Sequence, residues 1–158
     1  MFSIHVIALG AVRTSYFREA CEEYMKRSAP FARIVLTEIE AVPWKTDGER
    51  ERSKKKEGER LLRVLEKEEK KGAMIFLLDE NGKENTSENF SGLLEKYAGN
   101  TVVFVIGGAL GFGNEVHEKK YEHIALSRLT FPHELARVVL LEQIYRWITI
   151  AKGKTYHY

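Results

Sequence analysis

The sequence of 158 residues contains one cysteine and three prolines, and it has no long hydrophobic run. Cys21 has no partner for an internal disulfide, which favours reducing, intracellular surroundings and a cytoplasmic protein. No apolar run approaches the ~20 residues of a membrane span, so no membrane association is expected. The apolar residues 4–9 lack a basic leader and a cleavage site, and they are interpreted as a first strand rather than an export signal.

Common cofactor motifs are also absent. A dinucleotide-binding G-x-G-x-x-G would follow the first strand, but this strand ends in the single Gly10. The Gly-Lys-Thr at 153–155 has Ile148 where a phosphate loop needs its first glycine, and a helix precedes it. His5, His117 and His123 are scattered along the chain. No spacing of His, Cys, Asp and Glu suggests a metal site, so no metal is expected.

The charge is nearly balanced, with 25 basic and 23 acidic residues and a net charge of +2. This value does not by itself indicate a nucleic-acid-binding protein. Residues 45–71 hold 11 basic and 8 acidic residues. Because the acids are interleaved, a solvated helix face explains this excess; the alternative is an RNA contact through Lys54, Lys55 and Lys56. Residues 123–158 hold 5 basic and 2 acidic residues, with arginines inside an otherwise apolar segment.

Strand-like and helix-like runs alternate from one end to the other, without a linker or repeat, which predicts one α/β domain over 1–158. The continuous apolar runs AMIFLL and TVVFVI, separated by a helix, are typical of a buried parallel sheet. A turn at Asn81-Gly82 should end the third strand. Strands are expected at Phe2–Leu9, Arg33–Ala41, Ala73–Leu78, Thr101–Ile106 and His123–Leu126, and helices at Tyr16–Lys26, Glu49–Lys71, Thr86–Tyr97, Asn114–Lys120 and Pro132–Ile150.

Two loops are candidate ligand sites. Residues 106–113 place four glycines directly after a buried strand, where main-chain amides can approach a nucleotide-like group closely; the alternative is a tight strand-to-helix turn. Residues 126–133 mix hydroxyl groups, apolar side chains and free backbone. That segment suits an adenosine moiety, with Thr130 as a plain N-terminal helix cap as the alternative.

The last predicted helix carries an arginine within a stripe of apolar side chains. The stripe comprises Arg137, Leu141, Ile144 and Ile148. An arginine among apolar neighbours is normally paired or reaches a charged ligand, although it can also extend to water from the helix end. Further apolar positions at 138–141 and Trp147 indicate a second buried face and hence a subunit contact.

The chain ends in Tyr156-His157-Tyr158. Chain ends commonly fray, but these side chains can also fold back into a site, with tyrosine stacking on a base and histidine exchanging a proton. Glu142 and Arg146 form an i, i+4 pair just before this tail.

Over essentially its full length the sequence resembles the ribosomal RNA large subunit methyltransferase H family, which are small SPOUT (α/β-knot) methyltransferases. Four blocks in order carry the resemblance: Phe104-Val-Ile-Gly-Gly108 with Gly111, Leu126-Ser-Arg-Leu-Thr-Phe-Pro-His133, Arg137-Val-Val-Leu-Leu-Glu-Gln-Ile-Tyr-Arg146, and Gly153 with Tyr156-His157.

The resemblance implies a knotted parallel-sheet fold with a C-terminal trefoil knot within about 73–158, and a homodimer. It implies S-adenosylmethionine as the methyl donor, and methylation of N3 of a pseudouridine in a 23S rRNA stem-loop on assembled ribosomes. The cofactor pocket would be lined by Leu78, Gly107, Leu126, Ser127, Arg128, Leu129, Thr130 and Phe131.

The chemistry expected from the resemblance assigns roles to four residues. His157 would accept the N3 proton, Tyr156 would stack on the base, and Arg137 or Arg146 would hold phosphate or base carbonyls. Two alternatives stay open at this point: a ribosome-associated binding factor without catalysis, and a knotted methyltransferase that acts on tRNA or on a ribose 2′-oxygen.

Overall fold

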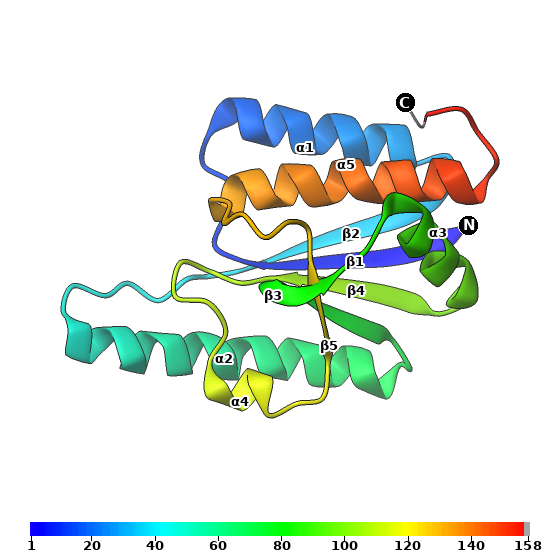
Figure 1. Ribbon diagram of the computed structural model, residues 1–158. Coiled ribbons are helices and arrows are strands. Elements are labelled where there is room, and N and C mark those ends of the chain that lie inside the picture. Colours follow the sequence, from blue (N-terminus) through cyan, green and yellow to red (C-terminus); the bar gives the residue numbers. More distant parts are fainter. Residues whose placement is uncertain (157–158) are drawn as a thin grey trace.

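The computed structural model describes residues 1–156, which form a five-stranded parallel sheet with helices on both faces (Figure 1). The strand order is β2-β1-β4-β3-β5. Helices α1, α3 and α5 cover one face, and α2 and α4 cover the other. In chain order the elements are β1 (Phe2–Leu9), α1 (Ser15–Ser28), β2 (Ala32–Ile39), α2 (Asp47–Lys70), β3 (Met74–Glu84), α3 (Ser87–Lys96), β4 (Thr101–Ile106), α4 (Asn114–His117), β5 (Glu122–Ala125) and α5 (His133–Ala151).

The central strand β4 shows why the sheet is parallel and buried on both faces. Its residues alternate between two cores: Phe104 belongs to the core under α1, α3 and α5, whereas Val103 and Val105 belong to the core under α2. In the first core the Phe90 ring stacks on Trp147 at a centroid distance of 4.1 Å. Such a strand has no polar face, which explains its continuous apolar sequence and confirms the predicted α/β class.

The third strand differs from its predicted end at Leu78. It continues to Glu84, with a register shift between Leu78 and Lys83 where both pair with Ile124 on β5. The turn expected at Asn81-Gly82 is therefore an irregularity inside the strand. A Cβ on Gly82 would lie 2.6 Å from the backbone nitrogen of Ile124, so only glycine permits this close approach of β3 to β5.

The helix boundaries also differ from their predicted positions, by up to three residues. Helix α2 begins at Asp47, because Thr46 and Glu49 form a capping box that the sequence reading missed. Helix α4 ends at His117 instead of Lys120, and Pro132 is the N-cap of α5 instead of its first helical residue. The trefoil knot stays a prediction. Within residues 1–156, no helix is both long and apolar enough to span a membrane.

Candidate functional site

A cavity of about 600 Å³ opens where β4 and β5 end, beside residues 78–81 of β3, where the buried part of that strand ends. Parallel strands place their carboxyl ends at one edge of the sheet, which is where open α/β sheets bind ligands. Loop 107–113 after β4 and loop 126–132 after β5 supply much of the wall. All but one of the residues predicted to bind the cofactor line this cavity: Leu78, Gly107, Leu126, Ser127, Leu129, Thr130 and Phe131.

The remaining predicted residue, Arg128, lies outside the cavity lining. Its side chain is 72% exposed and its Nε atom lies 3.3 Å from Oε2 of Glu84. The guanidinium is therefore directed to the extension of β3, and a contact between Arg128 and the cofactor stays a prediction.

The glycines of loop 107–113 allow a tight main-chain path. Gly111 has a φ of +68°, a conformation that favours glycine, and its N–H donates to the Gly108 carbonyl at 3.0 Å. A Cβ on Gly107 would lie 3.4 Å from the Phe112 ring, so the loop packs against its own aromatic side chain. The loop is thus a tight turn and, at the same time, a wall that exposes backbone to the cavity.

Loop 126–132 is held by its own hydroxyl groups. The Ser127 hydroxyl accepts from the Leu129 N–H at 3.0 Å, and the Thr130 hydroxyl donates to the Glu80 carboxylate. Thr130 is therefore not the N-cap of α5, which was the alternative considered for it. The Leu129 side chain, 72% exposed, lies on the cavity wall without a core contact to explain it.

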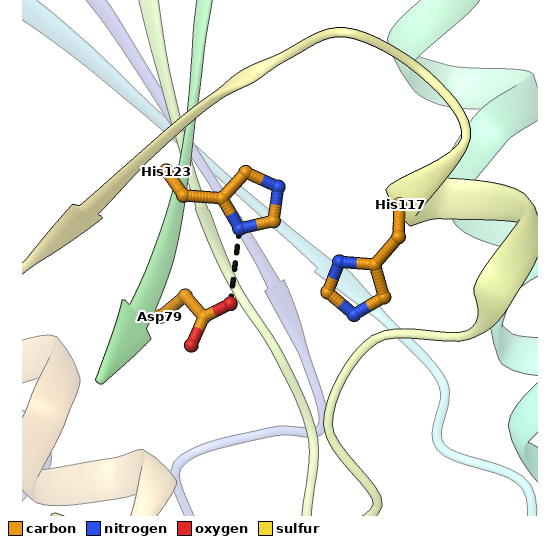
Figure 2. A group of neighbouring side chains, drawn as sticks. All are labelled: Asp79, His117 and His123. Atoms are coloured by element: carbon orange, nitrogen blue, oxygen red, sulfur yellow. Dashed lines mark hydrogen bonds and ion pairs between the residues drawn. The ribbon is translucent and has the colours of Figure 1, made fainter. Parts of the chain in front are cut away.

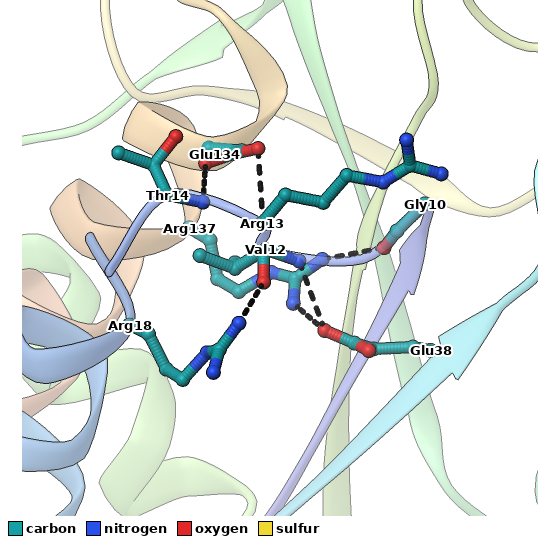
Figure 3. A network of polar contacts seen from close by, with 8 residues as sticks. All are labelled: Gly10, Val12, Arg13, Thr14, Arg18, Glu38, Glu134 and Arg137. Carbon is teal, nitrogen blue, oxygen red and sulfur yellow. Dashed lines mark hydrogen bonds and ion pairs between the residues drawn. The ribbon is translucent and has the colours of Figure 1, made fainter. Parts of the chain in front are cut away.

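Arg137 is buried near the start of α5, within a network of polar contacts (Figure 3). It is 1% exposed, forms an ion pair with Glu38, and donates to the Gly10 carbonyl at 2.8 Å. Glu38 also accepts from the Val12 N–H, and Glu134 accepts from the N–H groups of residues 13 and 14. The predicted pairing of Arg137 is present, but its partners are protein groups that hold the loop between β1 and α1.

Two other predicted catalytic residues, Arg146 and Tyr156, lie together at the opposite end of α5. The Tyr156 ring packs on Tyr145 at 4.6 Å and lies 5.0 Å from the Arg146 guanidinium. A hydrogen bond to Glu142 raises the pKa of Arg146, and burial raises the pKa of the Tyr156 phenol, so Tyr156 is neutral at physiological pH. His157 lies outside the described residues, as does Tyr158.

Two of the histidines that appear scattered in the sequence meet beside the cavity (Figure 2). His123 Nδ1 lies 2.9 Å from Oδ2 of Asp79, and the His117 ring stacks on the His123 ring. Burial pushes the pKa of Asp79 upward, but hydrogen bonds from the Asn81 N–H and from His123 outweigh it and hold this pKa below its ordinary value. Asp79 is thus a carboxylate at neutral pH.

Sequence reasoning missed several cavity residues. Residues 79–81 line the cavity and directly follow the buried part of β3, so the rule on carboxyl ends of parallel strands could have found them. Lys54 also lines it. It comes from α2, and nothing in its local sequence signals that this helix reaches the same edge of the sheet. His133, which also lines the cavity, is the last residue of the predicted segment 126–133.

Comparisons with known proteins agree with this fold. The sequence model of the family described as "Predicted SPOUT methyltransferase" matches residues 2–157. A crystal structure described as that of a hypothetical protein resembles the chain with a TM-score of 0.54 at 11% identity, covering 94% of this chain and 68% of that one. At this identity the likeness concerns the fold alone.

Relatives in sequence are closer. The ribosomal RNA large subunit methyltransferase H of Pelotomaculum thermopropionicum is 40% identical over 100% of both chains. The proteins of the same name from Desulfitobacterium hafniense (strain DSM 10664 / DCB-2) and Kosmotoga olearia are 40% and 36% identical, each with 99% of both chains covered. The chain therefore belongs to the SPOUT methyltransferases and, among them, to the ribosomal RNA large subunit methyltransferase H family.

Proposed function

We propose that this protein transfers a methyl group from S-adenosylmethionine to N3 of a pseudouridine in a 23S rRNA stem-loop on the assembled ribosome. The observation that carries the proposal is the cavity between loops 107–113 and 126–132, at the carboxyl ends of β4 and β5 and beside residues 78–81 of β3. It joins exposed backbone, hydroxyl groups and apolar side chains in a volume suited to one nucleoside-sized ligand.

The residues present fit this methyl donor. Leu78 and Leu129 offer apolar surface to an adenine ring, while the backbone of loop 126–132 offers donors and acceptors to its edge. When bound, S-adenosylmethionine supplies an already electrophilic methyl group. The protein then has to align the acceptor nitrogen and remove its proton.

Proton removal and base positioning fall to the C-terminal segment. His157 accepts the N3 proton, neutral Tyr156 stacks on the base, and Arg146 holds a phosphate or a base carbonyl. The same role for Arg137 requires its guanidinium to leave Glu38 and Gly10. We therefore keep this role for Arg137 only for a conformation that forms when the substrate binds.

A homodimer would bring the two halves of this site together. Within one chain Tyr156 packs beside Arg146, whereas the cavity lies at His133, about 20 Å away along α5 at 1.5 Å per residue. Leu135 and Val139 of α5 are only partly buried, as a contact between subunits requires. Pairing of two copies through α5 therefore supports catalysis across the interface.

Parallel methyl-transfer assays test the proposed reaction. Labelled S-adenosylmethionine is offered with assembled ribosomes, with naked 23S rRNA and with tRNA, and the modified nucleoside is identified by mass spectrometry. Label at N3 of a pseudouridine, on ribosomes and not on tRNA, is expected. Label on tRNA or on a ribose 2′-oxygen would replace the proposal by that activity.

Calorimetry with S-adenosylhomocysteine separates the catalytic proposal from a ribosome-associated binding factor, for which no heat is expected.

Leu129→Ala is predicted to weaken binding of S-adenosylhomocysteine without lowering stability. Leu129 is largely exposed in the free protein, so it gains burial only if a ligand covers it. The expected loss is about 1–2 kcal/mol, or roughly 5- to 30-fold in Kd. Calorimetry and thermal unfolding measure the two effects. Val35→Ala, at a partly exposed apolar site on β2, is the matched control, and equal affinity losses in both variants would contradict the cofactor contact.

Neutralising Lys55 and Lys56 is predicted to weaken binding to the ribosome. Both are exposed on the first half of α2, whereas the adjacent Lys54 lines the cavity and is left intact. If each lysine contacts one phosphate, the salt dependence of log K flattens by about 2 in the double Gln variant. Binding is measured across a salt series. The matched control is Lys67→Gln with Lys70→Gln near the end of α2, and the same salt dependence in both double variants would make 55–56 ordinary solvated surface.

A further inference from the structure

Three side chains that can bind a metal ion come from three elements and meet at the edge of the cavity (Figure 2). They are Asp79 of β3, His117 of α4 and His123 of β5, and one ligand atom from each lies within 4.8 Å of the others. Within residues 1–156, no other group of three His, Cys, Asp or Glu side chains meets this closely. Nothing in the proposed methyl transfer uses these two imidazoles.

The donor set selects a class of cation. Two imidazole nitrogens and one carboxylate oxygen match Zn²⁺, which accepts both kinds of donor, and leave a fourth position of a tetrahedron for water. Mg²⁺ and Ca²⁺ prefer oxygen donors throughout, so they match this set poorly. The segment that carries the three residues is acidic, with 8 acidic and 4 basic residues in 72–122, which favours a cation.

The three side chains are held close to, but not at, metal-binding distances. Ligands about 2.0–2.1 Å from one Zn²⁺ lie about 3.4 Å apart in a tetrahedron, so the group must contract by up to about 1.4 Å. His123 pairs with Leu77 in the β3–β5 register, and the other carboxylate oxygen of Asp79 accepts from the Asn81 N–H at 2.9 Å. These two ligands are therefore positioned by the sheet. The exposed His117, on the four-residue helix α4, can supply the movement.

We propose that Asp79, His117 and His123 form a Zn²⁺-binding site that ties α4 and β5 to the end of β3. The site borders the proposed cofactor cavity, which Asp79 and His117 line, but it does not depend on the proposed RNA substrate. Because the three ligands come from different elements, the unfolded chain has no comparable site. Binding of the ion therefore stabilises the native state.

Calorimetric titration of the untagged full-length protein, first treated with a chelator, tests the site. With ZnCl₂ we expect one ion per chain, and with MgCl₂ no measurable heat. His117→Ala and His123→Ala are each expected to weaken Zn²⁺ binding by ~10-fold or more, because two ligands alone hold the ion poorly. Zn²⁺ should also raise the Tm of the wild-type protein and leave the Tm of His117→Ala nearly unchanged.

His133→Ala is the matched control, because His133 also lines the cavity but lies outside the cluster. It should bind Zn²⁺ as the wild type does. His117 is exposed, so its removal leaves the core intact, and the Tm of the metal-free variant verifies this. No heat with ZnCl₂, or unchanged Zn²⁺ affinity in both His117→Ala and His123→Ala, would overturn the proposal. Both results are independent of methyl transfer.

Discussion

Replacing His157 by alanine is expected to lower turnover by ~10²–10⁴-fold and to leave the affinity for S-adenosylhomocysteine nearly unchanged. The N3 proton of the acceptor must be removed for the nitrogen to accept a methyl group, and His157 is the assigned proton acceptor. The described residues that line the cofactor cavity lie mainly on β3, β4 and the loops after β4 and β5, so this substitution should not alter it. Single-turnover methyl transfer to ribosomes and calorimetry measure the two quantities.

Tyr158→Ala is the control for the His157 variant, because it changes the same tail without removing the imidazole. It should retain most of the turnover. Wild-type turnover in His157→Ala would contradict the assignment of the base. An equally large loss in Tyr158→Ala would instead point to the position of the tail as a whole.

Glu38→Ala is expected to destabilise the protein more than Arg137→Met, although Glu38 is the more exposed partner of the pair. Loss of Glu38 leaves a guanidinium that is 1% exposed without its counter-charge, at a cost of about 3 kcal/mol. Loss of Arg137 leaves a carboxylate that is 40% exposed and can be hydrated, together with the Gly10 carbonyl, at about 1–2 kcal/mol. Denaturant unfolding at neutral pH measures both values.

A double-variant cycle controls this comparison. Adding Arg137→Met to Glu38→Ala removes the unpaired buried charge, so the double variant should be more stable than Glu38→Ala alone. Glu38→Gln keeps an acceptor while removing the charge and should lie between wild type and Glu38→Ala. A greater loss for Arg137→Met than for Glu38→Ala would show that the hydrogen bonds of the guanidinium, and not the cost of leaving it unpaired, dominate.

Much of the sheet could be predicted because each strand has a local hydrophobic pattern in the sequence. After Thr101 the run VVFVI has no polar residue, and β4 has a core on each face. The loops after β4 and β5 could also be predicted from the sequence, since glycines and mixed polar residues directly follow buried strands. The extension of β3 to Glu84 could not be predicted, because it depends on the fit of Gly82 against the backbone of β5.

Arg137 illustrates the limit for charged groups. Its place on the apolar stripe of α5 predicted that the guanidinium is paired, and it is. The stripe contained no information on whether the partner is a ligand or the protein itself. The partner, Glu38, is 99 residues away on β2, and the two meet only because α5 packs beside the end of that strand.

The residues alone determined the α/β class, the order of the elements, the family resemblance and the two loops that enclose the cavity. These follow from patterns within short windows, where hydrophobic period, glycine and turn chemistry act locally. The tertiary structure decided that Asp79, His117 and His123 are neighbours. It also decided that Arg137 binds the loop after β1, and that Tyr156 lies beside Arg146, far from the cavity. Such contacts depend on which strands pair and on how the helices cross them. Neither can be inferred from how far apart the residues are in the sequence.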